Sequence, residues 1–300
     1  MAPNRFLHHS HGFEQEKLSH AGRQHPLGLA YPAIIEIRTR AHWSRNPTWI
    51  ATSWSALRLY GMRWFCDHAD ACFITRTTWQ APRSVLHARR HGWIRSPEPQ
   101  QKLMLKSGLD PTVPPLRTAP PELAVASALD SVQRGTHSWW VPKVPGMTPT
   151  EVRLIQLADA CCRLWDLVPA ALLPLIHHYL NSRECRLIAR HSDAGSDSPA
   201  ETSLRLALTG LAEGMVTQHR IFIDNRLISV ADIAWPRLKV LVYYDGGHHG
   251  ERPQWETDNA LSRALLQAGY IVLRYTRAEL SNLTWIRHNV SAVLQSAQVN

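Results

Sequence analysis

The chain lacks the marks of a secreted, zinc-binding or membrane protein. Its 300 residues include five cysteines, with no C-x-x-C pair among them, which argues against a zinc knuckle. An odd cysteine count without regular spacing is typical of a reducing compartment. No apolar run reaches the roughly 18 residues of a membrane span, and the first 25 residues contain no apolar signal core. We therefore expect a cytoplasmic protein with no membrane partner.

Positive charge is in excess. The chain has 33 Lys and Arg against 24 Asp and Glu, a formal net charge of +9. Most of the positive residues are arginines, whose planar guanidinium suits phosphate. A basic surface can also serve solubility alone, and it indicates partners rather than fold. DNA is the partner that we expect. The tryptophans are interpreted as packing residues, except that Trp139 and Trp140 are candidates for stacking on bases.

The length predicts about two domains. A polar, His-rich start predicts a flexible tail rather than a metal-binding tract. Beyond it we expect a smaller mixed N-terminal region with a helix near Ser53, a strand near Phe73 and a helix that begins at Pro120–Pro121. Apolar residues spaced by three and four then predict a helical connector. The expected bounds are 1–30 for the tail, 31–145 for the α+β region, 146–192 for the connector and 197–300 for a C-terminal domain.

The last hundred residues have the clearest pattern. Ser198, Pro199 and Glu201 form a capping-box sequence with proline at the first helical position. Alternating apolar residues and turn signals then predict the order α-β-β-β-α-β-α. The fold class is therefore α/β (α+β), with a mixed sheet flanked by helices. The expected strands are 216–223, 227–234, 239–244 and 270–275, and the later helices are about 256–268 and 279–298.

The segment DIAWPRLKVLVYYDGGHH, residues 232–249, carries the candidate chemistry. Asp232 shares strand parity with Ile228 and Val230, which is unusual for an exposed carboxylate. Asp245 ends the next strand, so the two carboxylates could share one Mg²⁺ ion against a phosphate. His248 or His249 could act as a general acid or base, or donate a hydrogen bond to phosphate.

Each candidate also has a structural interpretation. Glu201 at the third helical position can cap the helix and pair with Arg205 four residues on. Asp232 and Asp245 can be strand-end turn residues, and the two histidines can be a surface loop pair. Arg274 on the last strand can reach a phosphate, or it can be solvated or paired.

The C-terminal domain resembles a family of domains similar to very-short-patch-repair (Vsr-like) endonucleases, in the PD-(D/E)XK restriction-endonuclease-like superfamily. The resemblance covers a third of the chain and implies Mg²⁺-dependent hydrolysis of DNA phosphodiesters on a restriction-endonuclease-like sheet. It makes Asp232 the metal-binding Asp, Glu201 a helper carboxylate and His249 the phosphate-side His. The matching residues are SPAETSLR (198–205), VADIAWP (230–236), YDGGHH (244–249), Gln254, Asp258 and AGYIVLRYT (268–276).

The chain departs from that family's pattern at several positions. The family usually places Glu two residues before the Asp of its D-G step, where this chain has Tyr243. Tyrosine is neutral near pH 7 and a poor Mg²⁺ ligand. No lysine follows Asp245 closely, and the basic residue usual early on the next helix is missing, which leaves Arg263 further along. Two hypotheses follow: a Mg²⁺-dependent DNA endonuclease, or a catalytically degenerate nuclease fold that serves as a DNA-binding or regulatory module.

The N-terminal half carries a second resemblance. SALRLYG (55–61) and RTAPPELAVASALD (117–130) resemble the N-terminal part of actinobacterial proteins related to abortive-infection antitoxins. The small winged helix of such proteins is not evident in this sequence. By analogy alone, this resemblance implies an antitoxin-like interaction protein with a protein partner bound through the N-terminal half.

Overall fold

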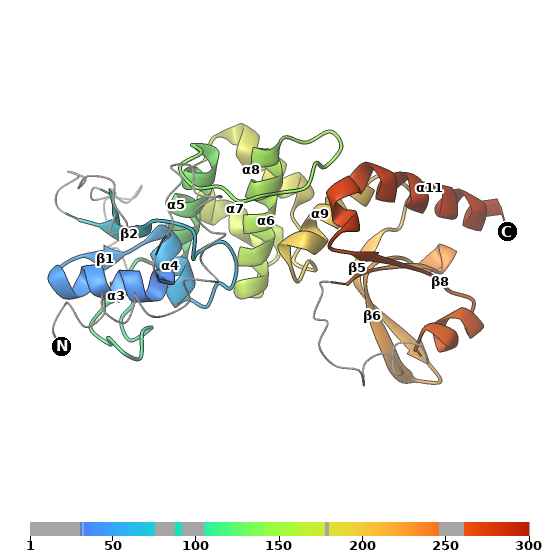
Figure 1. Cartoon of the computed structure of the whole chain (residues 1–300), viewed down its shortest axis with the longest axis horizontal. Helices are drawn as coiled ribbons and strands as arrows, with labels where there is room; N and C mark the ends of the chain where they lie inside the picture. Colours follow the sequence, from blue (N-terminus) through green and yellow to red (C-terminus); the bar gives the residue numbers. More distant parts are fainter. Residues whose placement is uncertain are drawn as a thin grey trace. The chain divides into compact units, whose positions relative to one another are not determined.

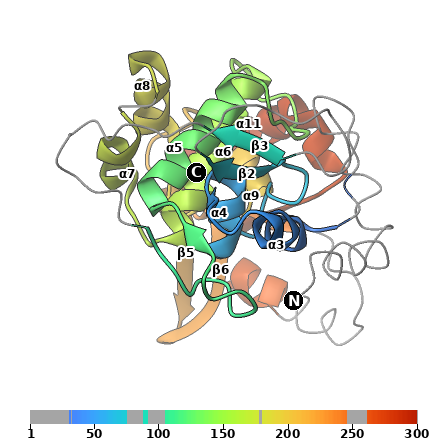
Figure 2. The same cartoon turned by 90° about the vertical axis from the view of Figure 1, so that its left-hand side faces the viewer.

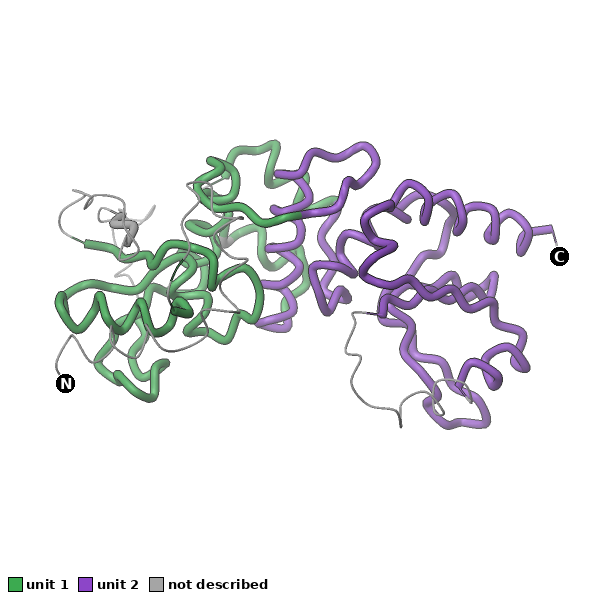
Figure 3. Tube along the Cα trace, in the orientation of Figure 1, with its two compact units in different colours: residues 1–140, 167–190 green, residues 141–166, 191–300 purple. Residues whose placement is uncertain are grey.

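The computed structural model of the chain describes residues 31, 33–75, 88–91, 105–177, 180–245 and 261–299 (Figure 1). These residues form two compact units, shown in separate colours in Figure 3. The N-terminal unit is residues 1–140 with 167–190, and the C-terminal unit is residues 141–166 with 191–300. Each unit contains a four-stranded mixed sheet, so the mixed α/β class predicted from the sequence is confirmed.

The two units divide the expected helical connector between them. Helix α6 (Pro149–Leu164) belongs to the C-terminal unit, whereas α7 (Pro169–Ile176) and all but the last residue of α8 (Ser182–His191) belong to the N-terminal unit. The reason is packing, because α6 contacts α9 (Pro199–Leu208) and α7 contacts α5 (Pro121–Gln133). Within the described residues, none of the helices combines the length and apolar character that a membrane span needs.

The N-terminal unit is built on a small sheet in the order β3-β2-β1-β4. Figure 2 faces this unit and shows β2 and β3 side by side. Strands β1 and β2 are antiparallel, and the other two pairs are parallel. Its first elements are α3 (Ile35–Arg45), β1 (Ile50–Ala51), α4 (Ser53–Leu59), β2 (Ala71–Ile74), β3 (Ala88–His91) and β4 (Arg117–Thr118).

A buried arginine holds α3 in the N-terminal unit. Arg38 is 4% exposed, and its guanidinium lies 3.8 Å from the ring centroid of Tyr31. The Tyr31 hydroxyl donates to the Asp70 carboxylate. Because backbone carbonyls take up the guanidinium donors, the buried cation keeps hydrogen bonds in place of water. The three carbonyls are those of Ala33, Asp67 and Ala69, at 2.8, 2.9 and 2.9 Å.

The C-terminal unit has the element order that its sequence predicts. Its sheet has the order β5-β6-β7-β8, with β7 and β8 parallel and the other pairs antiparallel. A specifically restriction-endonuclease-like topology stays a prediction. The elements after α9 are β5 (Val216–Ile223), β6 (Arg226–Trp235), the 3-10 turn η2 (Pro236–Leu238), β7 (Val240–Asp245), a helix at 261–267, β8 (Ile271–Thr276), the turn η3 (Glu279–Asn282) and α11 (Leu283–Val299).

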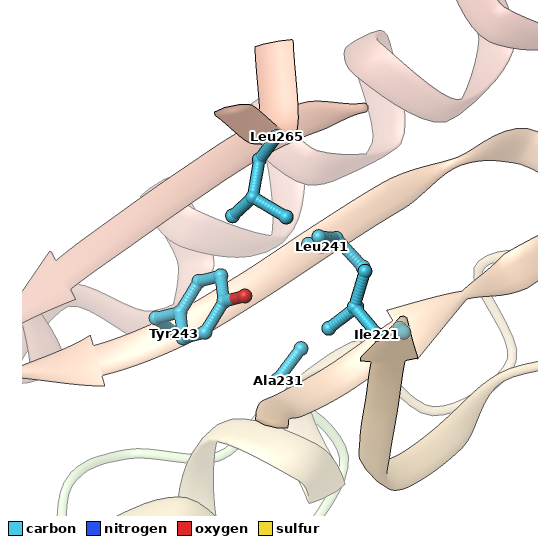
Figure 4. Packing of buried hydrophobic residues seen from close by; sticks show 6 residues of the cluster. Ile221, Ala231, Leu241, Tyr243 and Leu265 are labelled. Atoms are coloured by element: carbon cyan, nitrogen blue, oxygen red, sulfur yellow. The ribbon is translucent and has the colours of Figure 1, made fainter. Parts of the chain in front are cut away.

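Strand β7 is buried on both faces of this sheet. Leu241 and Tyr243 lie on one face and pack with Leu265 of the helix at 261–267 (Figure 4). The alternate residues Val240 and Val242 are fully buried, and α11 contacts both β7 and α9. The continuous apolar run of β7 follows from this two-sided burial.

A buried ion pair fixes α9 against α6. Asp159 and Arg205 lie 2.8 Å apart, with side chains 1% and 6% exposed. Asp159 also accepts hydrogen bonds from the Thr202 hydroxyl and the Asp193 backbone N–H, both at 2.8 Å. Burial raises the pKa of Asp159, and the nearby Arg205 opposes that rise. These contacts set the position of α9, whose first turn carries Glu201.

Candidate carboxylate site

Glu201 lies in the first turn of α9, and its carboxylate binds the two residues that precede the helix. Its carboxylate accepts hydrogen bonds from the Asp197 backbone N–H at 2.9 Å and from the Ser198 hydroxyl at 2.8 Å. Ser198 in turn accepts from the Glu201 backbone N–H at 3.3 Å. Ser198 is therefore the N-cap that the sequence predicts, and only the reciprocal bond to Glu201 comes from Asp197 instead of Ser198. The expected Glu201–Arg205 pair is wrong, because Arg205 turns inward to Asp159.

Asp232 lies near the point where β6 and β7 stop pairing. The last registered pair is Ile233 with Val242. Beyond it, the Tyr244 backbone N–H donates to the Asp232 carboxylate at 2.7 Å. The Asp232 side chain thus takes the place of a ladder carbonyl, which fixes its orientation.

Gln218 on β5 joins the two carboxylates. Its side-chain amide donates to Glu201 at 3.2 Å and to Asp232 at 3.4 Å. Gln218 has a φ of +47°, which is uncommon for a residue with a Cβ. Such conformations persist where the surroundings enforce them, and they gather at functional sites. Sequence reasoning missed Gln218, since a polar residue in a half-buried strand carries no signal of its own.

Burial, together with neighbouring carboxylates, raises the pKa of both Glu201 and Asp232. Burial, followed by the charge of Asp232, raises the pKa of Glu201 from its ordinary 4.5 to about 7. Burial also raises the pKa of Asp232, against the opposing effect of its donors Tyr244 and Gln218, and the charges of Asp197 and Asp245 add to the rise. A carboxyl that titrates near neutral pH is suited to donate or accept a proton.

Asp245 and Arg274 lie together at the end of the parallel pair β7–β8. The Arg274 guanidinium nitrogen is 3.6 Å from the Asp245 carboxylate, and the guanidinium lies 4.9 Å from the centre of the Tyr243 ring. Arg274 therefore already has a carboxylate and an aromatic neighbour. Its expected contact with nucleic acid stays a prediction.

Tyr243 is a structural residue at the position where the resemblance expects Glu. Its side chain belongs to the core cluster of Figure 4, and the residue is 7% exposed. Its hydroxyl donates to the Ser229 hydroxyl across the sheet at 3.0 Å. Burial raises its pKa, so the side chain is neutral and supplies no anionic ligand.

Of the remaining predicted site residues, only Arg263 lies within the described part of the chain. Arg263 is exposed on the helix at 261–267. His248, His249, Gln254 and Asp258 lie outside the described residues. The structure thus brings Glu201, Asp232 and Asp245 into one neighbourhood, with Gln218 added.

The described residues do not fit a magnesium cage. The resemblance implies Mg²⁺ held by Asp232 and Asp245, but in the described ranges no three Asp, Glu, His or Cys side chains converge where a cation could bind. Asp232 accepts protein hydrogen bonds on both oxygens, and Asp245 is paired with Arg274. Mg²⁺ requires near-ideal octahedral oxygen coordination, so we derive no chemical step through a metal.

Trp139 is a packing residue. It is 6% exposed, and its ring stacks on Phe65 with centroids 4.0 Å apart. Its neighbour Trp140 is 63% exposed. The expectation that both tryptophans offer a stacking platform is therefore wrong for Trp139, because its ring already has a protein partner.

The excess positive charge of the chain lies in the N-terminal unit. The N-terminal unit has 20 Lys and Arg against 10 Asp and Glu, a net +10, and the C-terminal unit has 13 against 14, a net −1. The carboxylate site is therefore in the unit without excess positive charge. The excess positive charge and the candidate site therefore belong to different units.

Comparison of the chain with protein-family models, curated proteins and solved structures finds no match. The fold and the site define a mixed α/β protein whose C-terminal unit gathers carboxylates from α9, β6 and β7. The carboxylate site and the charges of the two units are therefore the features that bear on function.

Proposed function

We propose that the C-terminal unit is a nuclease-like domain that contacts DNA without Mg²⁺-dependent hydrolysis, as a DNA-binding or regulatory module. The observation that carries this proposal is Tyr243. The residue in the expected Glu position is bonded to Ser229 and packed in the core. A core tyrosine at a position where the resemblance expects a metal-binding Glu supports a nuclease-like fold that has lost part of its catalytic site.

The charge of the N-terminal unit supports DNA as the partner. Its net +10 provides long-range attraction to a polyanion, which is sequence-independent and weakens with salt. Exposed Arg63 and Lys106 are among its basic residues. In this proposal the N-terminal unit supplies affinity, and the C-terminal unit positions the nucleic acid.

The carboxylate site has a role in this scheme without hydrolysis. Protonated Glu201 can donate a hydrogen bond to a phosphate oxygen, whereas ionised Glu201 beside Asp232 repels it. Because the pKa of Glu201 is about 7, both forms are populated near neutral pH.

A second candidate, an endonuclease, is favoured by Gln218. Its left-handed backbone and its two carboxylate partners are typical of a site held for chemistry rather than for stability. The function would then be hydrolysis of a DNA phosphodiester by water at the Asp232 site.

One set of assays separates the two candidates. We would measure binding of a labelled duplex by fluorescence anisotropy, and nicking of supercoiled plasmid with Mg²⁺ or Mn²⁺. The wild-type chain and the variants Asp232→Ala and Tyr243→Glu are compared. The first candidate predicts salt-dependent binding with no nicking, and a gain of nicking in Tyr243→Glu would support it further.

Other results exclude a candidate. Wild-type nicking that is lost in Asp232→Ala would establish the endonuclease and overturn the non-hydrolytic proposal. Nicking that survives Asp232→Ala would rule out this site as its source. Absence of duplex binding at low salt would contradict both candidates.

A further inference from the structure

The β5–β6 hairpin ends in an uncovered apolar pair. Phe222 and Leu227 lie opposite each other across the hairpin, and they are 56% and 51% exposed. The chain turns between them at Asp224 and Asn225, whose φ values of +49° and +60° match the left-handed pair that a two-residue hairpin turn requires. Single exposed apolar residues are ordinary, but two large ones at one projecting tip form a local contact surface.

The exposed pair belongs to a row of side chains on one face of the hairpin. The next exposed rung is Arg220 with Val230, which is 37% exposed. Ile221, between the two rungs, is 1% exposed and packs in the core cluster. A register shift between Ile221 and Phe222 adds one residue to β6, so that Leu227 instead of Ile228 pairs with Phe222.

The same row leads to the carboxylate site. Gln218 and Asp232 follow the rung of Arg220 with Val230, between the registered pairs Thr217–Ile233 and His219–Ala231. We call these residues the hairpin track: Phe222, Leu227, Arg220, Val230, Gln218 and Asp232. With a strand rise of about 3.3 Å per residue, the track is about 16 Å long from Leu227 to Asp232. At 3.4 Å per base-pair step, this length corresponds to between four and five steps of duplex DNA.

The charges of the hairpin complement a phosphate backbone. Arg220 and Arg226 are exposed, and neither forms an ion pair within the described part of the chain. Asp224 is the single acidic residue from 216 to 231. The hairpin is thus locally basic in a unit whose net charge is −1. Arginine presents a planar fork of donors that matches phosphate oxygens.

We infer that the hairpin track is a binding surface for duplex DNA, with Arg220 on a backbone phosphate and the Phe222–Leu227 pair as an apolar wedge at a base step. Apolar side chains on DNA-binding proteins insert between base steps and partly unstack them, and a two-stranded ribbon fits a DNA groove. A DNA strand bound along the hairpin track would pass Gln218 and Asp232. The inference rests on the proposed DNA-binding function and names the contact that positions the duplex.

The test uses the full chain and two matched pairs of variants. Phe222→Ala combined with Leu227→Ala removes the wedge, and Leu266→Ala, at an apolar residue that is 60% exposed in the same unit, is its control. Arg220→Ala removes the phosphate contact, and Arg237→Ala, at an exposed arginine beyond the other end of β6, is its control. Binding of a labelled duplex is measured by anisotropy over a salt series, and unstacking is measured by the fluorescence of 2-aminopurine placed within the duplex.

The inference predicts different losses for the two variants. The wedge variant should lose the rise in 2-aminopurine fluorescence that the wild-type chain produces. Arg220→Ala should bind several-fold more weakly, and its salt slope should fall by about one. Both controls should behave as the wild type. Because all five substituted residues are exposed, thermal melts of the variants should match the wild type. Phe222→Leu should keep part of the fluorescence rise.

Three outcomes would overturn the inference. If the wild type binds and unstacks DNA but the hairpin variants do so equally well, the track is not the contact and the proposed function stands. If the wild type binds no duplex, the inference and the proposed function both fail. If light scattering shows a wild-type dimer that the wedge variant dissociates while DNA affinity is unchanged, the apolar pair binds a second copy of the chain.

Discussion

The two units differ in net charge and in where their charged groups lie. The N-terminal unit has a net charge of +10, and its most buried cation, Arg38, is bonded to backbone carbonyls. The C-terminal unit has a net charge of −1, and charged groups lie inside it, in the Asp159–Arg205 pair and at the Glu201–Asp232 site. The net positive charge of the whole chain therefore comes from the N-terminal unit alone.

Charge therefore has a different physical effect in each unit. Net positive charge attracts polyanions over a long range, and the N-terminal unit carries it. Buried charge is costly unless it is paired, so the ion pair of the C-terminal unit bears on stability and the clustered carboxylates bear on chemistry. Substitutions in the two units should consequently change different measurable quantities.

The largest expected effect is on the stability of the C-terminal unit. Asp159→Ala leaves Arg205 buried without its carboxylate, which should lower the free energy of unfolding by about 3–5 kcal/mol. Urea unfolding followed by circular dichroism measures this loss. The control is Arg163→Ala, which breaks the exposed Arg163–Asp197 pair and should cost less than about 1 kcal/mol. Equal losses in the two variants would contradict a structural role for the buried charges.

The next effect is on binding by the N-terminal unit. Arg63→Glu and Arg237→Glu each reverse one exposed charge, in the N-terminal and the C-terminal unit respectively. Arg63→Glu should weaken duplex binding several-fold and lower the salt slope by about one, as expected for a lost phosphate contact. Arg237→Glu should change binding much less. Anisotropy titrations over a salt series measure binding by both variants. A larger loss of affinity for Arg237→Glu would contradict the larger contribution expected from the N-terminal unit.

The smallest effect is the pH dependence of stability through Glu201. Its pKa rises from 4.5 unfolded to about 7 folded, so between these values the folded chain binds more protons than the unfolded one. Its contribution to stability therefore falls as the pH rises through that window. Glu201→Gln removes this titration, so its melting temperature relative to wild type should increase from about pH 5 to about pH 8. Glu213→Gln, at an exposed carboxylate, is the control, and an identical pH profile for Glu201→Gln and wild type would refute the raised pKa.

Local patterns predicted most of the C-terminal unit. Strand β5 has the bounds expected from its sequence, and the turn lies at Asp224–Asn225, because alternation and turn residues act over a few positions. In the N-terminal unit, α3 was not predicted, because two of its buried residues, Arg38 and Thr39, are polar. Helix α8 lies within the helical connector expected over 146–192, but it was not predicted as a separate helix, since Ile188 is its single fully buried residue.

Long-range contacts were beyond local patterns. Arg205 was expected to pair with Glu201 four residues earlier, but it pairs with Asp159, which lies 46 positions away in the sequence. The parity of Asp232 correctly marked a carboxylate that is not freely exposed. No pattern indicated Gln218, whose importance comes from its left-handed backbone and its two partners.

Local patterns alone established the order of elements from α9 onward, the carboxylates of the candidate site and the tyrosine at position 243. Those features depend on periodicity, turn chemistry and residue identity, which are local. Packing in three dimensions makes Tyr243 a core residue bonded to Ser229 and joins Glu201 to Asp232 through Gln218. It also sets how the excess positive charge divides between the two units. These properties depend on which distant segments pack together, because burial and neighbouring charge set both the pKa of a carboxyl and the role of a tyrosine.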